Sequence, residues 1–102
     1  MTLEVEFHKA MVGIYQDGLK HCNYRAARFL QMVSNEGGLK TAKKLLADSN
    51  KVSEGFMNLL ECNRLDLTVE ALVLKVRFQP LFTEKELTEA KFRLEQYHYL
   101  IQ

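Results

Sequence analysis

The chain has 102 residues, of which 47% are hydrophobic and 26% are charged, and its formal net charge is +1 at pH 7. This composition is typical of a soluble globular protein, and we expect residues 1–102 to form a single domain. A net charge so close to zero argues against a protein whose whole surface binds nucleic acid. The lack of a long apolar run argues against a signal peptide or a membrane span, so we expect a cytoplasmic protein that does not enter a membrane.

The first predicted helix begins after Thr2, a suitable N-cap, and continues to about Lys20. Apolar residues recur on one face of this segment at helical spacing. Gly13 and Gly18 each weaken the helix by about 1 kcal/mol relative to Ala. They mark either the close approach of another helix or early fraying.

The middle third of the chain is basic. Residues 21–51 carry six Lys or Arg and two Asp or Glu. Asn23 is expected to cap a second helix over 24–33, and a turn at 34–38 leads into a third helix over 39–47. The outer faces of these two helices hold the candidate nucleic-acid contacts, which are Arg25, Arg28, Lys40, Lys43 and Lys44.

Two short basic helices joined by a glycine turn have the outline of a helix-turn-helix. The third helix offers mainly Lys, however, and Lys serves phosphates better than base edges. A solubilising stripe on a short amphipathic helix remains an alternative interpretation.

Cys22 and Cys62 can pair only if the fold brings them together, and in a reducing compartment we expect two free thiols packed as small apolar groups. A loop is expected at 48–51. Ser53 then caps a fourth short helix, and Asn63 suits a left-handed stop at its end.

The chain after residue 64 carries too many apolar side chains for one amphipathic face, which indicates a helix enclosed by others. Asp66 or Thr68 caps this fifth helix. Pro80 disfavours helical geometry in the residue before it, so the helix should end by about Phe78. Alternating apolar residues at 74–78 leave a strand open as the alternative.

The last helix has the strongest start signal in the chain. Thr83 and Glu86 have the spacing of a capping box, and the helix is expected to continue to about Leu100. Glu89 and Arg93 lie four residues apart and form a favourable ion pair.

We therefore predict an all-α fold, a compact orthogonal bundle of five or six short helices. Its core should include Phe29, Leu59, Leu72, Val73, Val76, Leu87 and Leu94. Phe92 lies off the apolar seam of the last helix, and with Tyr99 nearby it suggests a second contact surface, for either the rest of the core or a partner. Phe92 and Tyr99 are therefore the candidate partner contacts.

Recognisable catalytic chemistry is missing from the sequence. There is no phosphate loop, nucleophile elbow or zinc-spaced cluster. Glu4 and His8 lie one turn apart, but no nucleophile or second acid accompanies them, so we interpret them as a surface pair. We expect no enzyme, no catalytic residue, no cofactor and no metal site.

Several segments resemble a small helical module of bacterial proteins. They read RLDLTVEALVL at 64–74 and FQPLFT at 78–83, together with Asn23-Tyr24, FLQMV at 29–33 and Gly37-Gly38. The resemblance carries no catalytic motif and implies no activity. It implies a bacterial, cytosolic setting and an interaction role.

Together these observations predict a small non-catalytic helical module that acts through protein–protein interaction, as a subunit, inhibitor or regulatory adaptor. The partner is another protein or a second copy of the chain. The alternative is nucleic-acid binding through a basic face formed by the helices at 24–33 and 39–47.

Overall fold

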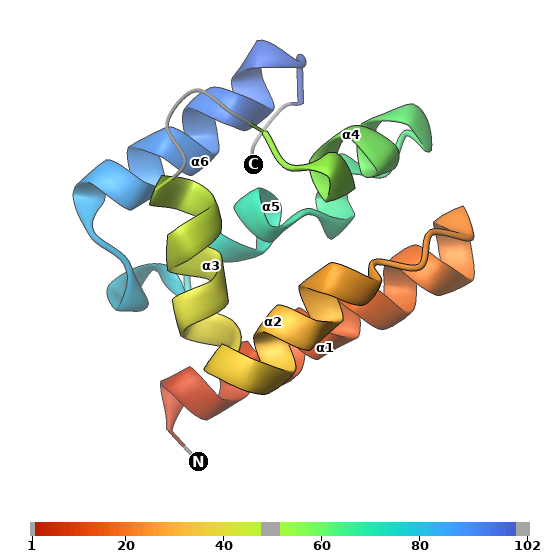
Figure 1. The fold of residues 1–102 in the computed structure, drawn as a ribbon. Helices are drawn as coiled ribbons and strands as arrows, with labels where there is room; N and C mark the ends of the chain where they lie inside the picture. The colour runs from red at the N-terminus through yellow and green to blue at the C-terminus, as the bar shows by residue number, and fades with distance from the viewer. Residues whose placement is uncertain (1, 48–51, 100–102) are drawn as a thin grey trace.

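The computed structural model describes residues 2–47 and 52–99, and Figure 1 shows that they form a bundle of helices. The six α-helices of these residues are α1 (Leu3–Cys22), α2 (Ala27–Glu36), α3 (Gly38–Ala47), α4 (Glu54–Glu61), α5 (Val69–Val73) and α6 (Glu84–Gln96). Two 3-10 turns, η1 (Leu65–Leu67) and η2 (Gln79–Leu81), flank α5. The described residues contain no strand, so the all-α prediction is confirmed and the strand alternative for 74–78 is wrong.

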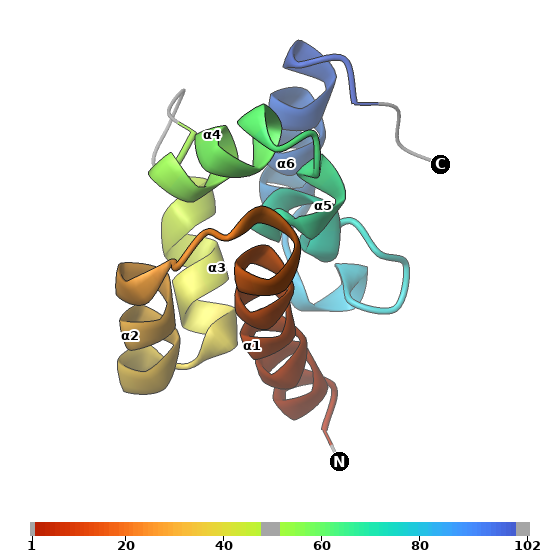
Figure 2. The same cartoon turned by 90° about the vertical axis from the view of Figure 1, so that its right-hand side faces the viewer.

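The helices surround α5, which contacts α1, α3 and α6 (Figure 1). Helices α1, α2 and α3 pack against one another, and α6 closes the bundle against α3 and α5. Figure 2 shows α4 lying across one end of the bundle, above α1 and α2. None of the helices in the described residues is both long enough and apolar enough to cross a membrane.

Local capping sets four helix starts. Thr2, Ser53, Thr68 and Thr83 each accept a hydrogen bond from the backbone amide three residues further on. Such side chains satisfy one of the first free N–H groups of a helix. The capping box at Thr83 is complete, because the Glu86 carboxylate also accepts the amide proton of Thr83 at 2.8 Å. The caps predicted at Thr2, Ser53 and Thr83 are therefore confirmed.

The second helix starts later than expected. Asn23 does not cap it but ends α1 in the left-handed region, with φ of 52°, and its amide donates to the carbonyl of Gly18. Helix α2 begins at Ala27 and continues to Glu36, so the expected glycine turn shrinks to Gly37 at φ of 91°. Asn is favoured both at helix N-caps and in the left-handed conformation at helix ends, so its identity alone does not distinguish the two positions.

The predicted central helix is broken. It was expected to continue to Phe78, but α5 ends at Val73 and the chain turns back on itself. The side-chain amide of Gln79 donates to the carbonyl of Leu74 at 2.8 Å, which satisfies one of the carbonyls that the helix leaves free. Val76 lies on the outside of this turn and is 83% exposed, so its placement in the core was wrong.

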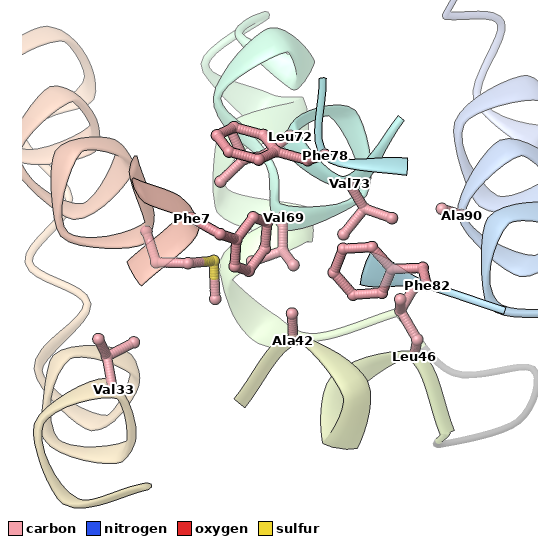
Figure 3. Close-up of a cluster of buried hydrophobic side chains, with 11 residues drawn as sticks. Phe7, Val33, Ala42, Leu46, Val69, Leu72, Val73, Phe78, Phe82 and Ala90 are labelled. Carbon is pink, nitrogen blue, oxygen red and sulfur yellow. The ribbon is translucent and has the colours of Figure 1, made fainter. Parts of the chain in front are cut away.

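The main core is built around Phe7, whose ring meets the rings of Phe78 and Phe82 edge to face at centroid distances of 5.2 and 5.3 Å (Figure 3). A second cluster joins α4 to α6 through Phe56, Leu65 and Leu94. Of the predicted core residues, Leu59, Leu72, Val73 and Leu94 are buried, while Phe29 and Leu87 pack against the core and are partly buried.

The cysteines are not free. Cys22, the last residue of α1, forms a disulfide with Cys62, the C-cap of α4, and their Cα atoms are 5.8 Å apart. The prediction of two free thiols was therefore wrong, because the ends of two helices that are distant in sequence meet in space. Asn63 follows at φ of 62°, the left-handed stop that was expected.

Two expectations concern residues outside the described ranges. They are the loop at 48–51 and the end of the last helix at Leu100. Within the described residues α6 ends at Gln96, and His98 has φ of 63°.

Candidate functional site

The lysines of α3 are engaged with carboxylates. Lys44 forms a hydrogen-bonded ion pair with Glu36, and the Lys40 nitrogen lies 3.9 Å from the same carboxylate. Lys43 points instead towards α6, where its nitrogen is 2.8 Å from Glu86 and 5.2 Å from the centre of the Phe82 ring. Two carboxylates thus offset much of the charge of the three lysines.

The two arginines lie apart from these lysines. Arg25 is exposed in the link between α1 and α2, whereas Arg28 lies on the first turn of α2 beside a pocket. Neither forms an ion pair within the described residues. The five basic residues therefore have different surroundings. Lys40 and Lys44 pair with Glu36, and Lys43 pairs with Glu86. Arg28 lies beside the pocket, and Arg25 lies in the link between α1 and α2.

The two candidate partner contacts also differ in surroundings. Phe92 is 53% exposed on the outer side of α6. Tyr99 is half-buried and packs against the second core cluster of Phe56, Leu65 and Leu94. Tyr99 therefore belongs largely to the core, and Phe92 is the more accessible of the two.

A mainly apolar pocket of about 230 Å³ is lined by α1, α2, α4 and the start of α5. A larger and more polar hollow of about 540 Å³ lies elsewhere, between α1, α5 and the end of α6. Helices α1, α2 and α4 supply much of the apolar lining of the 230 Å³ pocket. The residues are Ile14, Tyr15, Phe29, Met32, Phe56 and Leu59. Apolar walls with a few polar groups are typical of binding sites in helical proteins. Sequence reasoning did not identify this pocket.

Polar side chains also line the pocket. Arg28 and Glu54 are exposed lining residues of opposite charge, and neither forms an ion pair within the described residues. Tyr24 lies against the first turn of α4. Burial, reinforced by the nearby Glu54 carboxylate, raises the pKa of Tyr24 above its usual value. Its hydroxyl therefore stays protonated and able to donate a hydrogen bond.

Glu70 also lines the pocket, and it forms a buried ion pair. Its carboxylate accepts a hydrogen bond at 3.0 Å from Arg93, and both side chains are almost fully buried. Arg93 further donates to Glu89 at 2.7 Å, which confirms the predicted four-apart pair, and to the carbonyl of Leu45 at 3.0 Å. Burial raises the pKa of the Glu70 carboxyl, although Arg93 opposes this effect. This pair fixes one wall of the pocket.

No catalytic set emerges from the described residues. His8 does not pair with Glu4 as a surface couple; its Nδ1 accepts the amide proton of Gly38 at 2.9 Å and so caps the start of α3. Over 2–47 and 52–99, no group of three His, Cys, Asp or Glu is placed to hold a metal ion.

The residues that sequence reasoning missed had weak signals. Glu70 lies between the apolar Val69 and Leu72, and Arg93 is next to Leu94 on the inner face of the last helix. Opposite charges on the apolar faces of two helices indicate a buried pair when the helices pack together. The sequence did not show that α5 and α6 are neighbours.

Comparison with known proteins gives no assignment, because no protein-family model, curated protein or solved structure matches the chain. The resemblance to a bacterial helical module therefore remains an expectation, and function has to be argued from the geometry.

Proposed function

We propose that this chain is a non-catalytic binding module that holds a protein partner by one large apolar side chain inserted into the pocket between α1, α2 and α4. The observation that carries the proposal is the pocket itself, an apolar recess of about 230 Å³ whose edge carries one cation and one anion. Protein interfaces concentrate their binding energy in such pockets, where an aromatic or aliphatic anchor is enclosed by a polar rim.

The volume favours a side chain over a larger ligand. An apolar cavity of about 150 Å³ holds a benzene molecule. Pockets for small molecules usually measure about 300–1,000 Å³. The 230 Å³ recess lies between these values and suits one aromatic ring system or one leucine-sized group.

The charges at the edge suit a peptide segment. Arg28 and Glu54 have no ion-pair partner within the described residues, so each can pair with an opposite charge beside the anchor. Rim charges contribute more to selectivity and association rate than to affinity. We propose that the preferred partner carries an acidic residue close to its apolar anchor.

Nucleic-acid binding through α2 and α3 is the alternative, and the ion pairs of Lys40, Lys43 and Lys44 make it the weaker one. Salt-dependent binding needs several cations available to phosphates. A mobility shift with duplex and single-stranded DNA at two salt concentrations tests it. A shift that is lost when all three lysines are replaced by Ala would favour this alternative over the pocket.

The test of the proposal uses indole as a stand-in for the anchor and indole-3-acetate as an anchor with a neighbouring carboxylate. We expect both to shift the amide resonances of Gly18, Gly55 and Leu59 in a heteronuclear correlation spectrum. We expect indole-3-acetate to bind more tightly, because its carboxylate can reach Arg28.

A matched pair of variants isolates the charge. Arg28→Ala should remove the advantage of indole-3-acetate over indole, whereas Arg25→Ala, three residues away and outside the pocket lining, should keep it. Shifts confined to residues outside the pocket would contradict the proposal, as would an absence of binding by either probe.

A further inference from the structure

The disulfide lies near this pocket but outside its lining. It links the last residue of α1 to the residue that caps the end of α4, and both Cys22 and Cys62 are partly exposed. A reductant in solution can therefore approach the bond, as thiol–disulfide exchange requires. Neither cysteine belongs to the main core around Phe7.

One helical turn from the disulfide, the same two helices both line the pocket. Gly18 precedes Cys22 by four residues, and Leu59 precedes Cys62 by three. A Cβ atom built on Gly18 would lie 3.8 Å from Cδ2 of Leu59, so the two walls touch there. Both residues line the pocket. The disulfide therefore limits how far α1 and α4 can separate, one helical turn from these two lining residues.

Helix α4 has a second attachment that does not involve α1. The Phe56 ring lies 5.4 Å from the ring of Tyr97, and Phe56 packs with Leu65 and Leu94 in the second core cluster. Loss of the disulfide would leave this attachment in place. Helix α4 would then stay folded against η1 and α6, and only packing contacts such as that between Gly18 and Leu59 would hold it to α1.

We propose that the Cys22–Cys62 disulfide is a redox switch that controls the pocket, reduced by a dithiol and re-formed by exchange with the disulfide of an oxidised dithiol. A dithiol reductant attacks one sulfur, forms a mixed disulfide, and leaves as a cyclic disulfide. The protein gains two electrons and two protons and becomes a pair of thiols, while the dithiol is oxidised.

The consequence for binding rests on the proposed function. With the disulfide intact the walls are held in place, and a preorganised site loses less freedom when an anchor enters it. Reduction releases the α1 wall from the α4 wall and weakens the enclosure of the anchor. The oxidised protein is therefore the form that binds the partner tightly.

The experiment compares the purified protein before and after treatment with dithiothreitol, with thiols counted by alkylation and mass spectrometry. Two measurements are made on each form: the dissociation constant of indole, and amide hydrogen exchange along the chain. We expect reduction to raise the dissociation constant by about fivefold or more, within the usual range for coupling between sites. Exchange should become faster in α4 and in the last turn of α1, with little change in the α6 amides near Ala90.

The doubly substituted Cys22→Ser/Cys62→Ser protein is the control, and it should behave like the reduced form with or without dithiothreitol. Two free thiols in the untreated protein would overturn the proposal, as would an unchanged exchange pattern after reduction. Global unfolding on reduction would also overturn it, because the bond would then be a structural staple. If exchange responds as expected but indole binds neither form, the proposed function fails and the local switch at α1 and α4 stands.

Discussion

Helix α3 begins in close contact with α1, and a single added methyl group, in Gly38→Ala, tests this contact. The Gly38 amide donates to Nδ1 of His8 at 2.9 Å, so the two helices are in close contact there. A Cβ atom on Gly38 would lie 2.7 Å from the Cα atom of His8 and 3.1 Å from Cγ of Met11. The first distance is too short for any real contact, and a backbone atom cannot move aside as a side chain can. Gly38→Ala should therefore force α1 and α3 apart.

The size of the effect follows from three contributions. Overpacking of a tight contact costs about 1–3 kcal/mol. Loss of the hydrogen bond to His8 adds about 1 kcal/mol. The better helix propensity of Ala offsets up to about 1 kcal/mol of this loss. Gly38 does not have a left-handed φ, so the backbone conformation adds no strain for Ala. We expect a net loss of about 2 kcal/mol in the free energy of unfolding, which lowers Tm by roughly 10 °C in a domain of this size.

Gly13→Ala is the matched control, because it is the same substitution in a helix where no heavy atom lies within 4 Å of the added Cβ. It should stabilise the protein by about 0.5–1 kcal/mol. Urea and thermal unfolding of both variants, followed by circular dichroism, measure the difference. A Gly38→Ala protein as stable as Gly13→Ala would show that the α1–α3 contact is not as close as the structure has it.

Three further changes test other parts of the fold. Thr83→Ala should cost about 0.5–2 kcal/mol in urea unfolding through loss of the capping box, and an unchanged midpoint would argue against it. Arg93→Met should cost about 3–5 kcal/mol because it leaves Glu70 buried without its partner, and adding Glu70→Leu should recover part of that loss; a double variant no better than the single one would refute this. Burial raises the pKa of Glu86, but hydrogen bonds from Lys43 and Thr83 outweigh burial and lower this pKa below 4.5. The ionised Glu86 carboxylate should therefore stabilise the fold fully above pH 4.5. This stabilisation should be lost as the pH falls through the lowered pKa. Unfolding of the wild type and Glu86→Gln over that pH range measures this effect, and parallel curves would contradict it.

The helix starts at Thr2, Ser53 and Thr83 could be predicted because their causes lie within four residues of each other. Thr83 and Glu86 satisfy each other's backbone amides within one turn, and Thr2 and Ser53 cap their helices by the same short-range bond. The all-α class followed from the same local signals and from apolar spacing. None of these inferences needed knowledge of which helices are neighbours.

Helix ends were harder to predict, since they depend on where the chain must turn. The amide of Gln79 and the packing of Phe78 against Phe7 end the central helix at Val73. The position of Pro80 predicted only that the helix ends by about Phe78, and the alternation at 74–78 suggested a strand that does not form. Val76 was placed in the core because it is apolar, but it lies on the outside of the turn.

The candidate site was almost entirely a product of tertiary structure. The sequence marked the basic residues of the middle third, but only the packing of α3 against α6 paired Lys43 with Glu86. The packing of α1, α2 and α4 placed Arg28 beside the pocket. The Cys22–Cys62 bond spans 40 residues and the Arg93–Glu70 pair spans 23. A single sequence specifies each residue's local preference. Contacts across such separations depend on which helix faces pack together, and that is decided by the burial of the whole core at once.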